Sequence, residues 1–181
     1  MENPYNTPAA PMMEPQALDA SYEPTIFSMT GRIGRLRYLA YSAILFAMAL
    51  AYFAYWMFNG MSAIMTGGAQ GWAGQIALIA FGIPFFLFLS FAHIVFAVRR
   101  INDTDNSGWL VLLTFVPVIG HLFWFFLIFY PGTDGRNQYG PAPSANPPWV
   151  MLTGIGLPFV LIGAVVAFMT FFFTTFFAGM R

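Results

Sequence analysis

Cysteine and lysine are both absent from the 181 residues of the chain. Without cysteine, the protein can form no disulfide, no thiolate nucleophile and no thiolate metal site. Without lysine, and with a formal net charge of zero, it lacks the strongly basic face that nucleic-acid binding requires. We therefore expect no nucleic acid among its partners. The Gly-Lys-Ser/Thr loop that cradles nucleotide phosphates is excluded for the same reason.

Charged residues of both signs are scarce, at 8% of the chain, whereas apolar residues make up 59% and phenylalanine occurs 22 times. In a soluble domain about a quarter of the residues are usually charged. A chain with so few charges cannot cover its surface toward water, so its solvent must be lipid. The composition predicts an all-α membrane protein.

Residues 1–26 differ in composition from the rest. They contain five prolines, four acidic residues and no basic residue. Prolines at this density block helix formation, and few apolar side chains are available to offset the entropy lost on ordering. We expect a disordered acidic tail that lacks the apolar core of a cleaved signal peptide. A short docking peptide around Asn3, Pro4 and Tyr5 is the alternative role for this tail.

Four apolar segments reach the roughly 20 residues that a membrane-spanning helix needs. They predict about four transmembrane helices, near residues 38–58, 76–98, 109–130 and 159–177. We assign the first three to a membrane core of residues 27–143 and the last to an additional C-terminal region, residues 144–181. Pro158 is expected to divide that last region, with its start near Trp149 lying along the interface. A straight, strongly tilted helix is the alternative.

The third segment has two interpretations, because Pro117 and Gly120 lie in its middle. A kinked crossing is the expectation, since about 22 residues suit one span and are short for two half-spans. The alternative is a re-entrant hairpin that turns at this Pro–Gly pair. Such a hairpin would return the following loop to the side of the membrane on which the segment began.

The placement of arginine predicts an orientation. Three arginines precede the first segment and two follow the second, namely Arg32, Arg35, Arg37, Arg99 and Arg100. Residues 59–75, which connect the two segments, carry no charge. The positive-inside rule therefore places the N-terminus in the cytoplasm. Four crossings would then also put Arg181 in the cytoplasm, and would leave the loop of residues 131–148 outside.

The arginine-containing stretches predict a binding face. Arg32 and Arg35 are three residues apart, so they project from one face of the entering helix toward lipid phosphates. Arg99, Arg100 and Asp103 follow the second segment, and consecutive spans bring both stretches to one membrane face. We expect these five residues to be neighbours that contact an anionic lipid headgroup or an acidic partner, the protein's own tail included. The alternative is that the arginines only set topology.

A third polar stretch, residues 131–141, contains three glycines and two prolines. This composition predicts a loop with fixed turns between the last two apolar segments. Its candidate motif residues are Gly132, Asp134, Asn137, Tyr139 and Gly140.

Together, the three polar stretches resemble a family of bacterial membrane proteins grouped as domain of unknown function 805. That family shows a Gly-Arg-x-x-Arg-x-x-Tyr entry, an Arg-Arg-Leu-His-Asp then Ser-Gly-Trp junction, and a Pro-Gly-Thr-x-Gly-x-Asn-x-Tyr-Gly-Pro exit. The matching residues here are Gly31, Arg32, Arg35 and Tyr38; Arg99 to Asp103 with Ser107, Gly108 and Trp109; and Pro131 to Pro141.

The resemblance covers roughly residues 27–143, with the tail and the last span as additions to the family core. It implies a location in the bacterial inner membrane and no settled activity. The family's leucine and histidine are replaced here by Ile101 and Asn102. Any acid–base or ligand role of that histidine in relatives is therefore not available to this chain.

Catalytic residues are not evident. No Asp, Glu, Lys or Arg lies inside any predicted span, and His93 and His121 fall at different depths on the four-span interpretation. We therefore expect neither an enzyme nor a metal or cofactor site. The preferred function is a membrane scaffold or interaction protein, with homo-oligomers among its assemblies. A small oligomeric channel or transport subunit is the alternative.

Overall fold

The computed structural model describes residues 22–26, 28–66 and 69–178, and these are mainly helical. Three helices are long and apolar enough to cross a membrane, and a fourth apolar helix is shorter. No strand occurs in the described part, which has only isolated bridges such as Tyr22 with Pro143. The prediction of an all-α membrane protein is confirmed. The predicted acidic tail, up to residue 21, lies outside the described residues.

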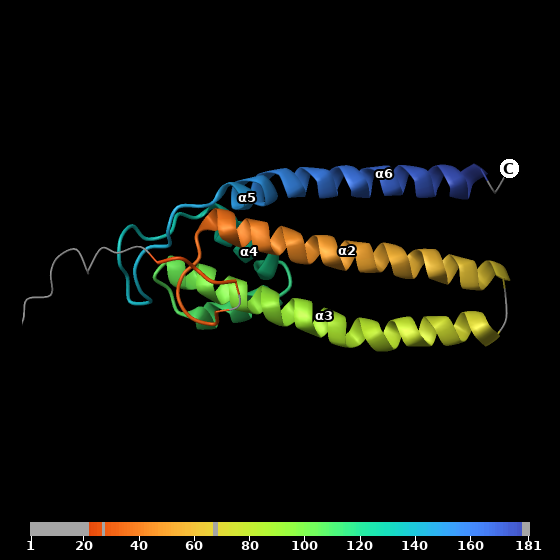
Figure 1. Cartoon of the computed structure of the whole chain (residues 1–181), viewed down its shortest axis with the longest axis horizontal. Coiled ribbons are helices and arrows are strands. Elements are labelled where there is room, and N and C mark those ends of the chain that lie inside the picture. The colour runs from red at the N-terminus through yellow and green to blue at the C-terminus, as the bar shows by residue number, and fades with distance from the viewer. Residues whose placement is uncertain (1–21, 27, 67–68, 179–181) are drawn as a thin grey trace, which may run out of the picture.

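Helices α2 (Arg35–Thr66) and α3 (Ala69–Asp103) form a long antiparallel pair (Figure 1). At 1.5 Å per residue they extend roughly 48 and 52 Å, which exceeds the ~30 Å hydrocarbon core of a bilayer. Pro84 lies inside α3 without ending it. The pair packs closely where the Tyr52 hydroxyl donates to the Leu78 carbonyl and lies over Gly82, at a point where a Cβ would collide with the ring.

The third segment is not one continuous helix. It consists of the 3₁₀-helix η1 (Gly108–Phe115), a turn, and the 11-residue helix α4 (Ile119–Phe129). Val118 in the turn has a φ of 66°, which reverses the chain. The start of the segment lies against Asn102, and Tyr130 at its end accepts a hydrogen bond from Arg100, so both ends meet α3 at its C-terminal end.

The crossing expected for residues 109–130 is therefore wrong, and the hairpin alternative describes the structure. We call residues 108–129 the hairpin. Helix α4 spans roughly 16 Å, about half the hydrocarbon core of a bilayer. The loop of residues 131–148 consequently lies at the same end of the molecule as Arg32, not at the opposite end as four crossings would require (Figure 1).

The last helical region continues without a non-helical residue through α5 (Pro148–Met151), the π-helix η2 (Leu152–Gly156) and α6 (Leu157–Ala178). Pro158 has no N–H, so a regular α-turn would leave the Gly154 carbonyl unpaired. The wider π-turn lies directly before the proline and absorbs this mismatch. The break expected at Pro158 is therefore wrong, and the helix is continuous as in the alternative, whose strong tilt stays a prediction.

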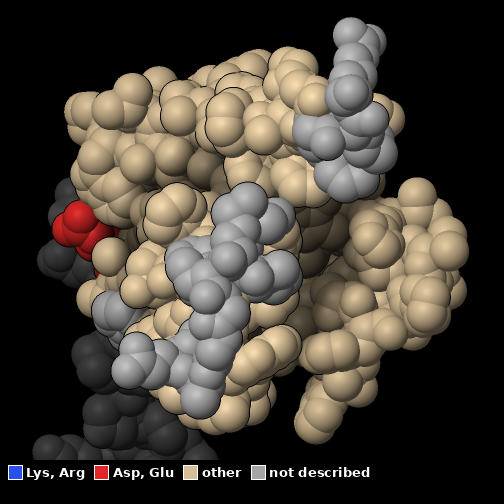
Figure 2. All heavy atoms as spheres, turned by 90° about the vertical axis from the view of Figure 1, so that its right-hand side faces the viewer, with Lys and Arg blue, Asp and Glu red and all other residues tan. Residues whose placement is uncertain are grey.

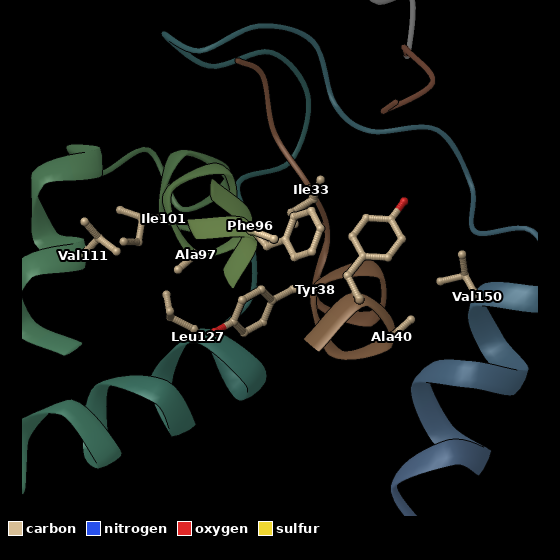
Figure 3. Packing of buried hydrophobic residues seen from close by; sticks show 11 residues of the cluster. Ile33, Tyr38, Ala40, Phe96, Ala97, Ile101, Val111, Leu127 and Val150 are labelled. Carbon is tan, nitrogen blue, oxygen red and sulfur yellow. The ribbon is translucent and has the colours of Figure 1, made fainter. Parts of the chain in front are cut away.

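The buried core is confined to one end of the bundle. Figure 3 shows its apolar part between α2, α3, the hairpin and α5, with the Tyr38 ring directed toward Leu127 of α4. Ile33, Ala97 and Val150 are also fully buried in this cluster. Farther along the helices the apolar side chains are exposed, and none of the most apolar window of the last helix is buried. Lipid, not protein, is the expected neighbour of those surfaces.

Candidate functional site

The carboxylate of Asp103 lies between two guanidinium groups at the end of α3. Arg32 Nε donates to Asp103 Oδ1 at 3.1 Å, and Arg100 Nη1 donates to Oδ2 at 2.6 Å. The side chains of both arginines are fully buried, and that of Asp103 is 6% exposed. We call Arg32, Arg100 and Asp103 the arginine clamp.

The remaining donors of the clamp point to backbone carbonyls. Arg32 Nη1 and Nη2 donate to Gly135 O at 2.7 Å and to Thr133 O at 2.6 Å. Arg100 Nε donates to Leu127 O at 2.8 Å, and its Nη2 donates to Tyr130 O. The planar fork of arginine suits such divergent acceptors, which lie in separate segments. The clamp thereby joins the entry to α2, the end of α3, the end of α4 and residues 131–141, which we call the exit loop.

The exit loop is folded onto the clamp. The Thr133 N–H donates to the Asp103 carbonyl at 2.8 Å, and Asn137 Nδ2 donates to Asn102 O at 2.8 Å. A Cβ on Gly132 would collide with the Asp103 carboxylate, so only glycine fits there. Asn137 and Gly140 pair through their backbones, and Gly140 has a φ of 125° that favours glycine.

The other two motif residues of this loop contribute less. Asp134 is exposed and belongs to neither ion pair found among the described residues. Tyr139 is half-buried, and its N–H donates to Asn137 Oδ1 at 2.9 Å. The loop therefore stabilises the clamp chiefly through Gly132, Asn137 and Gly140.

Arg35 and Arg99 lie at the same end but outside the ion pairs of the clamp. Arg35 is exposed and donates to Phe129 O at 3.3 Å. Arg99 is fully buried and directs Nη1 to Thr25 O at 2.8 Å, whereas its Nε and Nη2 have no hydrogen-bond partner among the described residues. The structure thus brings three of the five candidate residues into contact and directs Arg99 toward the entry segment.

Arg37 is a site residue that the sequence analysis did not include. It is buried, and its Nη2 donates to Ser144 Oγ at 3.2 Å and to Ala145 O at 3.1 Å. Its Nη1 has no partner within the described part of the chain. Arg37 and Arg99 both lie within electrostatic reach of the Tyr41 hydroxyl. The sequence held one signal for its separate role. Arg37 comes two positions after Arg35, so the two side chains leave the helix on different faces.

All charges of the described residues lie at one end, which we call the arginine end. Its arginines and acidic residues are Arg32, Arg35, Arg37, Arg99, Arg100, Arg136, Glu23, Asp103, Asp105 and Asp134. Figure 2 looks at the opposite end, where α2 and α3 are joined, and shows no Lys or Arg. The difference in charge between the two ends is larger than the sequence indicated, because the hairpin brings Arg136 to the arginine end.

A large lateral cavity lies between α2, α3, the hairpin and α6, with a volume of about 1190 Å³. His93 and His121 both line it. Among the described residues there is no group of three His, Asp or Glu side chains that could hold a metal ion.

A family model described as "Protein of unknown function (DUF805)" matches residues 26–141, well over half of the chain. The chain belongs to this family. The DUF805 match includes the clamp, the hairpin and the exit loop, and it ends before α5 begins.

The chain is similar to two inner membrane proteins of Escherichia coli strain K12. It is 34% identical to inner membrane protein YhaH over 104 residues, which cover 51% of this chain and 82% of YhaH. It is 37% identical to inner membrane protein YhaI over 94 residues, which cover 49% of this chain and 77% of YhaI. No solved structure matches the chain. It is thus a membrane protein of a DUF805 family whose function is unknown.

Proposed function

We propose that this DUF805 protein is a membrane scaffold whose arginine end faces the cytoplasm and contacts anionic lipid headgroups. The observation that carries the proposal is the segregation of charge. Every charged residue in the described part of the chain lies at one end, where six arginines outnumber four acidic residues. The positive-inside rule places such an end in the cytoplasm. Anionic lipids there attract a surplus of arginine at the surface.

The roles within the arginine end differ. In the clamp the guanidinium groups of Arg32 and Arg100 are occupied by Asp103 and by backbone carbonyls, so they fix the surface but are not free to bind lipid. Arg35 is exposed, and Arg37 and Arg99 keep unpaired N–H groups with no carboxylate partner within the described residues. A buried guanidinium group without a counter-ion is costly. A headgroup phosphate at Arg37 and Arg99 would supply both the charge and the acceptors that they lack.

The experiment compares thermal unfolding in nanodiscs of phosphatidylglycerol and of phosphatidylcholine. We expect the wild type to unfold at a higher temperature in phosphatidylglycerol. Arg99→Gln should lose most of this difference, because it removes unpaired donors. Arg136→Gln removes the same charge from an exposed loop residue and is the matched control, which should keep the difference.

Two results would refute the proposal. One is equal unfolding temperatures of the wild type in the two lipids. The other is an equal loss in Arg99→Gln and Arg136→Gln, which would indicate only a diffuse surface charge. A third variant, lacking residues 2–21, tests the acidic tail as the occupant instead. If its removal creates the lipid dependence that the full chain lacks, the tail and not lipid fills the site.

A small oligomeric channel is the second candidate, favoured by the hairpin itself. Non-helical backbone at membrane depth is found where it is buried in protein or lines a water-filled path. The turn residues Val116 and Val118 are 39% and 70% exposed in the single chain, so further copies would have to cover them. Ion or solute flux across liposomes that contain the purified protein would support this function, and the absence of flux would support the scaffold.

A further inference from the structure

The lateral cavity lies apart from the arginine clamp and is built by four separate elements. Its walls come from the first half of α2, the second half of α3, the turn of the hairpin and the start of α6. Its volume of about 1190 Å³ is above the roughly 300–1,000 Å³ typical of small-molecule pockets. Because three of its four walls belong to apolar helices of membrane-spanning length, the molecules that can reach it are those dissolved in the bilayer.

The lining restricts the charge of an occupant. Most of the side chains are aliphatic or aromatic, and no Asp, Glu, Lys or Arg is among them. An ionised headgroup would therefore enter without a counter-ion and lose its hydration, which is strongly unfavourable. The polar groups are uncharged hydroxyls, from residues such as Ser42 and Ser90, and the imidazoles of His93 and His121. This lining suits an uncharged polar group on an apolar body.

Ser42 differs from three threonines of the apolar helical segments. Thr114, Thr153 and Thr170 each bond back to a carbonyl of their own helix, at 2.6, 2.7 and 2.9 Å. Such back-bonding is the usual way to satisfy a hydroxyl in a membrane helix. Ser42 is 9% exposed, and its Oγ lines the cavity and makes no formed hydrogen bond among the described residues. The neighbouring Tyr38 hydroxyl can interact with it, but one bond between the two hydroxyls would still leave one of their two donors without an acceptor.

Two further polar groups lie beside Ser42. The Tyr38 hydroxyl is buried within interaction range of the Ser42 hydroxyl, and the described residues provide no other hydrogen-bond partner for either group. The ring of His93 lies 6.1 Å from the ring of Tyr38, measured between centroids, and His93 lines the cavity. Buried polar groups are normally fully paired, so an incompletely paired cluster beside a cavity indicates a missing hydrogen-bonding partner.

We propose that the lateral cavity binds an uncharged membrane amphiphile, whose hydroxyl or ester carbonyl hydrogen-bonds to Ser42 and His93 while its apolar chain lies between α2, the hairpin and α6. This site is independent of the arginine end. The occupant completes the pairing of the Ser42 and Tyr38 hydroxyls, and its chain fills an apolar space that neither water nor an ion can fill favourably.

The probe is a monoacylglycerol with a photoreactive diazirine in its chain, added to the full-length protein in nanodiscs. Illumination should attach it to peptides of α2 or α6. Val165→Trp places a large ring in the cavity wall and should lower labelling about tenfold. A tenfold loss corresponds to about 1.4 kcal/mol of binding free energy. Ala164→Trp adds the same ring at the neighbouring exposed position outside the lining and should label like the wild type.

A second pair of variants tests the polar contact. Ser42→Ala removes the hydroxyl that faces the cavity and should lower labelling roughly three- to tenfold, the effect of one hydrogen bond. Thr170→Ala removes a hydroxyl that is already bonded to Val166 O, and it should change nothing. A photoreactive fatty acid of the same chain length, ionised at pH 8, should label much less than the monoacylglycerol.

Three results would overturn the proposal. They are equal labelling of Val165→Trp and Ala164→Trp, equal labelling of Ser42→Ala and Thr170→Ala, and equally strong labelling of the same peptides by a photoreactive phosphatidylcholine. The last would mean that bulk lipid merely fills the space. If Val165→Trp fails to elute as a single folded species, the Ser42 and Thr170 pair and the three probes decide the question without it.

Discussion

The single carboxylate of Asp103 is the counter-charge for two buried guanidinium groups. The remaining positive charge is stabilised by the backbone carbonyls that accept hydrogen bonds from the two arginines. Removing one partner of a buried ion pair leaves an uncompensated charge, at a typical cost of about 3–5 kcal/mol. Here the carboxylate is shared, so its loss would leave both Arg32 and Arg100 without a counter-charge. The residue is therefore expected to matter more than any exposed charge of the same end.

We predict that Asp103→Ala and Arg100→Lys both lower the yield of folded, membrane-inserted protein. The lysine keeps the charge but cannot donate at once to Asp103, Leu127 O and Tyr130 O, as the guanidinium group does. Arg136→Ala, at an exposed position, should behave like the wild type. Size-exclusion elution and thermal unfolding after extraction measure the amount and the stability of folded protein. If Arg100→Lys matches the wild type in both, Arg100 serves only as a topology signal.

Part of the site could be predicted from the residues alone. Consecutive spans imply that Arg32 and Asp103 meet, since the entry to one helix and the end of the next lie at one face. Arg37 and the carbonyls of Leu127 and Tyr130 could not be predicted in this way. Which arginine faces inward depends on the rotation of α2, and the carbonyl acceptors become available only once the hairpin has folded back against α3.

At the scale of elements, the hairpin is the feature that the sequence left open. A segment of about 22 apolar residues satisfies the length of one span, so length favoured a crossing. In the structure, η1 and α4, the two arms of the hairpin, pack closely against each other. A Cβ on Gly120 would collide with the carbonyl of Thr114, so the arms approach each other at a distance that only glycine permits. Such tertiary contacts do not appear in a hydropathy pattern.

We predict that Gly120→Ala destabilises the protein by about 1–3 kcal/mol, the usual cost of an added methyl group in a tightly packed site. Gly156→Ala is the control, because its Cβ would meet the Leu152 side chain at an ordinary 3.7 Å. That variant should be neutral or slightly stabilising, since alanine favours helix over glycine. Thermal unfolding in one detergent compares the two, and equal stability of both variants would argue against the tight turn.

The remaining elements were more readily predicted. The first two spans and the last lie within α2, α3 and the continuous α5–α6 region, since long uncharged runs leave few alternatives. Small residues let membrane helices approach closely, so we predict that Gly163 of α6 packs against another helix. Within the described chain a Cβ there would meet nothing within 4 Å, so the contact would have to come from a second copy. Ala43 of α2 is buried.

At the scale of the whole molecule, the hairpin changes the number of crossings and therefore the side of each later segment. Three long helices and one hairpin place the exit loop with the entry to α2, and carry the end of α6 to the opposite end of the molecule (Figure 1). The charge distribution agrees with this arrangement, because Arg136 then joins the other five arginines of the described residues. Four crossings would instead have left it alone on the far side.

Cysteine labelling tests this account most directly, because the chain has no cysteine and any introduced one is a unique site. Thr30→Cys, Arg136→Cys and Ala178→Cys would each be treated with a membrane-impermeant maleimide, in spheroplasts and in inverted inner-membrane vesicles. The account predicts that the cysteines at 30 and 136 react only in inverted vesicles and the one at 178 only in spheroplasts. Reaction at position 136 from the face opposite to position 30 would contradict it.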